Sequence, residues 1–110
     1  MDAPSRRQHK VAEELAHHAG AFIAREGSTQ SLITVTRGDI APDLKKIIIF
    51  VSVLPKERAE EALNFLKRNR SEFHDYLKSK TALRNVPTVD FELDFGEENR
   101  QRVDDALRGK

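Results

Sequence analysis

Three histidines near the N-terminus are residues whose type could hold a metal ion. His17 and His18 are adjacent, so on a helix their side chains point about 100° apart and cannot grip one ion together. His9 lies nine residues before His18, which is not a standard ligand spacing on a helix. We therefore expect surface histidines and no metal site in this region.

Three carboxylates near the C-terminus, on Asp90, Glu92 and Asp94, are a second possible cation site. They alternate with four apolar residues, Val89, Phe91, Leu93 and Phe95. This alternation predicts a half-buried antiparallel strand with one face left to water. The carboxylates could bind a cation such as Mg²⁺, but a solvated strand face is the simpler interpretation, and we expect that.

Other catalytic chemistry has little support in this chain. It contains no cysteine, which excludes disulfides, thiolate metal sites and thiol catalysis. The serines lack a nucleophile-elbow context, and no glycine-rich phosphate loop is present. We therefore expect no enzyme, no catalytic residue and no cofactor.

Basic residues gather in one part of the chain although the net charge is only +1. Between residues 67 and 84, six basic residues face two acidic ones, whereas from residue 85 onward seven carboxylates face four basic groups. A domain polarised in this way can offer one face to a polyanion. Exposed helices with ordinary surface charge explain the pattern about as well.

The basic run lies where two helical stripes meet. Apolar residues at helical spacing from Ala59 to Leu66 resume in phase at Phe73, but Asn69 and Arg70 interrupt them. We predict a kink near residues 69–71, with Ser71 as a possible N-cap; one uninterrupted helix remains open. In RNA-binding domains of the KH type, two helices meet at a Gly-x-x-Gly clamp. This run has no glycine, so only its charge would attract phosphates.

The remaining elements complete an α+β pattern. We predict a helix around residues 11–23, a hairpin of strands 32–36 and 45–54 with a turn at 38–43, and a terminal helix over 97–107. The order helix, strand, strand, helix, kink, helix, strand, helix predicts a three-stranded sheet covered by helices on one face. Five phenylalanines lie on apolar faces and are expected in the core: Phe50, Phe65, Phe73, Phe91 and Phe95. Without an exposed aromatic platform, any RNA would be held by its backbone rather than by base stacking.

Length and composition agree with one small domain covering residues 1–110, expected to be a monomer when free. The chain is 38% hydrophobic and 34% charged, and no apolar run approaches the roughly 20 residues that cross a membrane. Basic residues near the N-terminus precede no apolar stretch, so we expect no secretory signal. Together with the lack of cysteine, this favours the cytoplasm.

Several short motifs, in order and at their spacing, resemble the bacterial ribosome-binding factor A family from about Arg7 to Leu107. The motifs are Arg7 with Val11 and the helix that follows, Ile33-Thr34-Val35-Thr36, Asp43-Leu44, Val51-Ser52, and Leu83-Arg84-x-x-Pro87-x-x-x-Phe91-x-x-Asp94. The resemblance implies a type II KH-like fold whose helices join at an Ala-x-Gly kink. It also implies a non-catalytic factor that binds the small ribosomal subunit late in the processing of its rRNA. Here Asn69-Arg70-Ser71 replaces the Ala-x-Gly motif.

The candidate RNA-binding residues follow from charge and from this resemblance. They are Arg6, Arg7, Lys10, Lys67, Arg68, Asn69, Arg70, Ser71, Lys78, Lys80 and Arg84. The expected partners are the small ribosomal subunit and its rRNA, with no membrane. The alternative is a protein-interaction module that grips a partner through its sheet or first helix. Convergence of the basic residues on one face favours RNA, and their scatter favours a protein partner.

Overall fold

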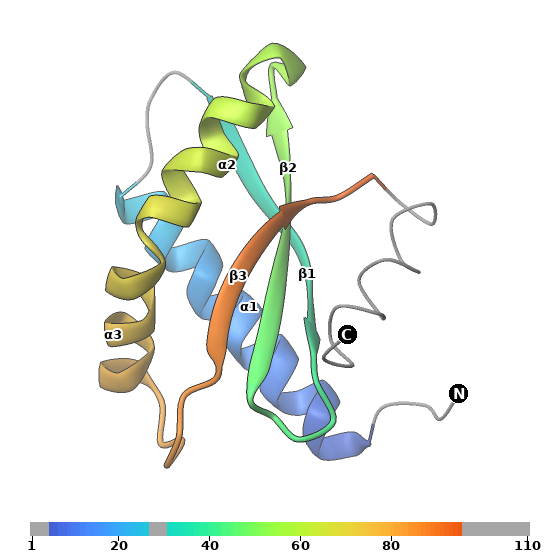
Figure 1. The fold of residues 1–110 in the computed structure, drawn as a ribbon, viewed down its shortest axis with the longest axis vertical. Coiled ribbons are helices and arrows are strands. Elements are labelled where there is room, and N and C mark those ends of the chain that lie inside the picture. Colours follow the sequence, from blue (N-terminus) through green and yellow to red (C-terminus); the bar gives the residue numbers. More distant parts are fainter. Residues whose placement is uncertain (1–4, 27–30, 96–110) are drawn as a thin grey trace.

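The computed structural model describes residues 5–26 and 31–95 of the chain (Figure 1). The elements are α1 (Arg6–Glu26), β1 (Leu32–Ile40), β2 (Lys46–Leu54), the 3₁₀ turn η1 (Lys56–Arg58), α2 (Ala59–Arg68), α3 (Arg70–Lys80) and β3 (Thr88–Leu93). The terminal helix predicted at 97–107 lies outside the described residues. No helix within the described ranges is long and apolar enough to span a bilayer.

The three strands form one sheet in the order β1-β2-β3. The predicted antiparallel hairpin of β1 and β2 is confirmed, and β2 is the central strand, as its unbroken apolar run indicates. The prediction that the last strand is antiparallel is wrong, because β3 pairs parallel with β2. Two helices return the chain to the same end of the sheet before β3 begins, as a parallel crossover requires. Alternating burial is the same in both pairings and could not distinguish them.

Strand β1 is longer than predicted, and the turn that follows it begins later in the chain than predicted. A register shift between Val35 and Arg37 places a bulge at Thr36, after which the strand continues to Ile40. The predicted turn at residues 38–43 is therefore wrong at its first three positions. The observed turn spans residues 41–45 and includes Leu44 at a positive φ of 62°.

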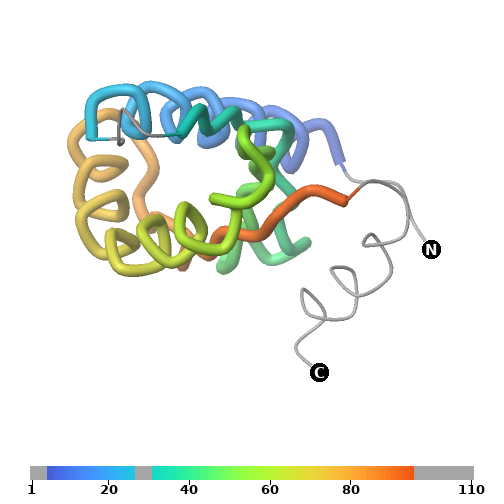
Figure 2. Tube along the Cα trace, turned by 90° about the horizontal axis from the view of Figure 1, so that it is seen from above, coloured from blue at the N-terminus to red at the C-terminus, as the bar shows by residue number. Residues whose placement is uncertain are grey.

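The main core lies between one face of the sheet and the three helices α1, α2 and α3. Its α1 stripe contains Val11, Ala12, Leu15, Ala19, Phe22 and Ile23. Rings from three elements meet at its centre, with the centroid of Phe73 5.2 Å from that of Phe22 and 5.8 Å from that of Phe91. Viewed from above, α1, α3 and α2 follow one another around this interior (Figure 2).

Of the five phenylalanines predicted in the core, one is exposed and another is buried on the other face of the sheet. Phe95 lies two residues beyond the end of β3 and is 65% exposed, so its placement in the core is wrong. Phe50 is fully buried, but on the opposite face of β2 from the core residues Ile49 and Val51. There the guanidinium carbon of Arg37 lies 4.0 Å from the centroid of the Phe50 ring. Thus the outer face of the sheet also buries an aromatic side chain.

Candidate nucleic-acid interface

The predicted kink exists, and a single residue, Asn69, separates α2 from α3. Its backbone N–H donates to Leu66 O at 3.0 Å, and its carbonyl accepts from Phe73 N–H at 3.0 Å. Its side-chain Nδ2 donates to Phe65 O at 2.8 Å and so satisfies a carbonyl of the last turn of α2. Asn69, not Ser71, is the N-cap residue of α3, and its side chain makes no capping bond there. Its φ of −103° is open to any residue, so this kink does not require glycine.

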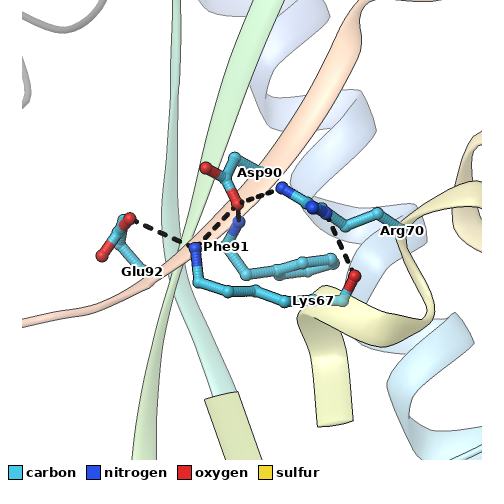
Figure 3. A network of polar contacts seen from close by, with 5 residues as sticks. All are labelled: Lys67, Arg70, Asp90, Phe91 and Glu92. Atoms are coloured by element: carbon cyan, nitrogen blue, oxygen red, sulfur yellow. Dashed lines mark hydrogen bonds and ion pairs between the residues drawn. The ribbon is translucent and has the colours of Figure 1, made fainter. Parts of the chain in front are cut away.

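Two cations beside the kink are paired with carboxylates of β3 (Figure 3). Lys67 Nζ lies 3.0 Å from Asp90 Oδ1 and 3.5 Å from Glu92 Oε2. Arg70 Nη1 lies 3.2 Å from the same Asp90 oxygen, and Arg70 Nε donates to Lys67 O at 3.0 Å. The expectation that Asp90 and Glu92 face only water is therefore wrong. The parallel placement of β3 beside α2 brings these charges together.

The pKa of Asp90 depends on two opposing effects, its burial and its contacts with Lys67, Arg70 and Phe91. Partial burial, the largest single influence, would raise the pKa of Asp90. The hydrogen bonds from Lys67 Nζ and from Phe91 N–H, with the charges of Lys67 and Arg70, outweigh burial and lower the pKa below its usual value of 3.8. The native network therefore holds Asp90 as a carboxylate.

Arg68 occupies a different side of the kink. It is exposed and makes no ion pair within residues 5–26 and 31–95. It lines a pocket of about 110 Å³ between α2 and the start of β1, together with Phe65 and Arg58. The Arg58 guanidinium lies 3.4 Å from Glu61 Oε2 in the same pocket. Arg68 is thus the cation of the kink most available to an external anion. Ser71 is exposed at the first turn of α3.

A second basic group lies where the C-terminal halves of α1 and α3 meet. Arg25 Cζ is 5.0 Å and Lys80 Nζ is 5.6 Å from the centroid of the Tyr76 ring. Lys78 is exposed on the same turn of α3 as Lys80. Arg25 is not among the residues predicted from the sequence, although its position one turn after Phe22 places it on the side of α1 that faces Tyr76.

The remaining predicted residues lie elsewhere. Arg6, Arg7 and Lys10 are exposed at the N-terminal end of α1, opposite the end that contacts α3. Lys10 and Arg25 are 15 residues apart on one helix, which at about 1.5 Å per residue is about 22 Å. Arg84 is exposed in the loop before β3, where His74 Nε2 lies 3.3 Å from Val86 O. The structure thus brings the kink residues together but not the whole predicted set.

The possible cation sites gain no support from the geometry. Across the described ranges, no three His, Asp or Glu side chains are grouped to hold a metal ion. Of the three strand carboxylates, Asp90 and Glu92 pair with Lys67, and Asp94 accepts a 2.6 Å hydrogen bond from the Thr36 hydroxyl. His18 lies 3.8 Å from Glu14, one turn earlier on α1.

A groove runs between α1 and β1, which is an edge strand of the sheet. Its volume is about 900 Å³, and α1 contributes small residues to it, among them Ala16, Gly20 and Ala21. An edge strand carries backbone groups that another chain can pair with. This groove is the feature that suits a protein partner.

Comparison with known proteins identifies relatives over nearly the whole chain. The family model described as "Ribosome-binding factor A" matches residues 7–107. A ribosome-binding factor A from Thermomicrobium roseum is 32% identical over 108 residues, covering 96% of this chain and 84% of the relative. One from Ruegeria sp. is 31% identical over 110 residues, covering 96% and 82%.

Solved structures show the same fold. The crystal structure of ribosome-binding factor A from Thermus thermophilus matches with a TM-score of 0.70 at 20% identity, covering 78% of this chain and 94% of that one. The solution structure of a putative ribosome-binding factor A from Thermotoga maritima matches with a TM-score of 0.69 at 20% identity, covering 88% and 96%. The predicted α+β, KH-like fold is confirmed. The chain belongs to the ribosome-binding factor A family.

Proposed function

We propose that this protein binds the small ribosomal subunit and contacts its rRNA during late maturation, as a cytoplasmic monomer without catalytic activity. The family match over residues 7–107 supports a ribosomal partner. The observation that carries the RNA contact is the break at Asn69, which presents three cations, Lys67, Arg68 and Arg70, around one short turn. This is the place where KH domains hold a nucleic-acid backbone.

The exposed cations suit phosphate contacts over an extended surface. Arg68 at the kink, Lys78 and Lys80 on α3, and Arg84 in the next loop are all exposed. Arg6, Arg7 and Lys10 form a second exposed group at the far end of α1. An rRNA-rich particle is large enough to meet both groups, whereas a short oligonucleotide would meet one. By the criterion set from the sequence, the separation of the two groups favours a protein partner; among RNA partners it suits a folded RNA surface better than a short strand.

Sedimentation with purified ribosomal subunits tests this function. We expect the protein to sediment with the small subunit and not with the large one, because the proposed function names the small subunit as the partner. Its affinity should fall about tenfold or more between about 50 and about 200 mM salt, since several phosphate contacts release counterions. Failure to sediment with mature or precursor small subunits at either salt would contradict the proposal.

Charge reversal at Arg68 tests the surface. Because Arg68 has no ion pair to lose within the described residues, Arg68→Glu should weaken binding to the small subunit while leaving the melting temperature nearly unchanged. Lys56→Glu is the matched control: Lys56 is exposed in η1, before the N-terminal end of α2, whereas Arg68 is the last residue of α2. Equal weakening by both variants would show that only net charge matters.

The α1–β1 groove supports one alternative, a protein-binding module. An extended segment of a partner could pair with the β1 edge, and backbone hydrogen bonds would supply most of its affinity. In that case binding to the subunit would depend little on salt, and Arg68→Glu would leave it unchanged.

A further inference from the structure

The cations Lys67 and Arg70 already hold an anion that belongs to the protein. Figure 3 shows both side chains converging on one oxygen of Asp90, with Lys67 placed between Asp90 and Glu92. The nitrogen–oxygen distances of 3.0 to 3.5 Å exceed the length of a strong charge-assisted hydrogen bond, about 2.7–2.9 Å, so a phosphate oxygen could replace these carboxylates at a shorter distance. The two positive charges meet two negative charges, so this side of the kink offers an incoming polyanion little net attraction.

We infer that Asp90 and Glu92 are intramolecular competitors of RNA phosphate at Lys67 and Arg70, and that they limit the affinity of the kink for RNA. The inference rests on the proposed RNA-binding function and names the residues that set its strength. RNA phosphate binds Lys67 and Arg70 by exchange: their nitrogens leave the β3 carboxylates and contact phosphate oxygens.

The geometry permits this exchange without unfolding. The side chains of Arg70 and Glu92 are 48% and 41% exposed, and β3 is the edge strand on this side of the sheet. The pairs that Arg70 and Glu92 make contribute little to stability, because water and salt screen such accessible charges. The Lys67–Asp90 pair is less exposed, at 32% and 25%, and contributes more. Lys67 carries its charge on a flexible stem, so its ammonium group can move while the α2 backbone stays in place.

The neighbouring residue Arg68 gives the exchange an entry point. It lies on another side of the same turn and has no ion pair within the described residues, so it can attract phosphate first. The backbone of a bound strand would then lie within a few residues of Lys67 and Arg70. RNA should therefore contact the available Arg68 first, and then Lys67 and Arg70 after these leave their carboxylate partners on β3.

The size of the effect follows from counterion release. Each phosphate neutralised on a single strand adds about 0.7 to the slope of log affinity against log salt. Taking the contact as negligible near 1 M salt, one additional contact at about 0.1 M raises affinity about fivefold. Removing the Asp90 charge should free Arg70 and loosen Lys67, so a gain of about fivefold is expected.

Titration of a fluorescent oligouridine RNA tests the inference. Wild type, Asp90→Asn and Asp75→Asn are compared at two salt concentrations. Asp75 is exposed on α3 and lies outside the network, so Asp75→Asn removes the same charge without releasing a kink cation. We expect Asp90→Asn to gain about fivefold with a steeper salt slope, and Asp75→Asn to gain less than about twofold. Glu92→Gln should gain in the same direction as Asp90→Asn.

Two controls separate a change in RNA affinity from a change in folding. Asn can still accept the hydrogen bond that Phe91 N–H donates to Asp90, so the strand should persist, and circular dichroism checks it. Adding Lys67→Gln and Arg70→Gln to Asp90→Asn should abolish the gain. Equal gains from Asp90→Asn and Asp75→Asn, or weaker binding by Asp90→Asn, would overturn the inference.

The proposed function can fail separately from this inference. Wild-type sedimentation with the small subunit depends on the whole surface, whereas the comparison of Asp90→Asn with Asp75→Asn depends only on the kink. If wild type sediments with the subunit but Asp90→Asn gains no oligouridine affinity, the competition is refuted and the function stands. If Asp90→Asn gains affinity while wild type never sediments with small subunits, the competition stands and the ribosomal role is refuted.

Discussion

Two glycines of this protein should respond to substitution with opposite signs. Gly38 lies in β1 where α1 crosses the strand, and a Cβ atom there would be 3.2 Å from Ala12 O and 3.4 Å from Cδ1 of both Ile47 and Ile49. Gly20 lies in α1, and a Cβ atom there would meet nothing within 4 Å. We predict that Gly38→Val destabilises the protein and that Gly20→Ala stabilises it.

The expected changes in stability follow from comparing the cost of overpacking with the gain from secondary-structure preference. Valine favours strands on a scale spanning about 1 kcal/mol, so local preference alone would make Gly38→Val stabilising. Ala12 O is part of the hydrogen-bonded backbone of α1 and cannot yield without moving the helix. Overpacking costs about 1–3 kcal/mol, and contact with backbone that cannot yield places this case at the upper end. After the gain of about 1 kcal/mol from strand preference, we expect a net loss of about 2 kcal/mol. At Gly20 the relief of glycine entropy in a helix should gain about 1 kcal/mol.

Urea and thermal unfolding followed by circular dichroism measure both effects. With about 4 °C per kcal/mol for a domain of this size, Gly38→Val should melt about 8 °C lower and Gly20→Ala about 4 °C higher than wild type. Gly38→Ala should be intermediate, because it adds one atom at the close contact. A Gly38→Val protein as stable as wild type would refute the close approach of α1 to β1.

Three further predictions concern the kink and the core. The pKa of Asp90 is lowered in the folded state, so its stabilising contribution is present above the usual carboxyl pKa of 3.8 and is lost as pH falls through the folded-state pKa. The free energy of unfolding, measured from neutral to acidic pH, should therefore fall less steeply in Asp90→Asn than in wild type. Equal slopes would contradict the pairing. Asn69→Ala removes the 2.8 Å bond to Phe65 O and should cost about 1 kcal/mol in urea unfolding, with unchanged stability as the contrary result. Phe73→Ala opens a cavity at a fully buried site and should lower the unfolding free energy by about 3–5 kcal/mol, and a loss below about 1 kcal/mol would show that the ring is not in the core.

Local patterns in the chain carry much of the fold. The helical stripe of α1, the apolar run of β2 and the lapse of apolar residues at Asn69 each predicted an element that the structure contains. Periodicity works at this level because it records which face of an element is buried. The same limit explains why Phe95 was wrongly placed in the core and Asp90 was wrongly expected to face only water. An alternating pattern does not identify which residues pack against each face.

The candidate site shows the same division more sharply. The sequence by itself determined that cations gather around the α2–α3 turn and that carboxylates share one face of the last strand. Only the tertiary structure decided that β3 runs parallel to β2, that its carboxylates meet Lys67 and Arg70, and that the cations of the α1 N-terminus lie far from Arg25 and Lys80. The physical reason is that burial is encoded residue by residue along one element, whereas the pairing of strands and charges depends on how distant elements are placed against one another.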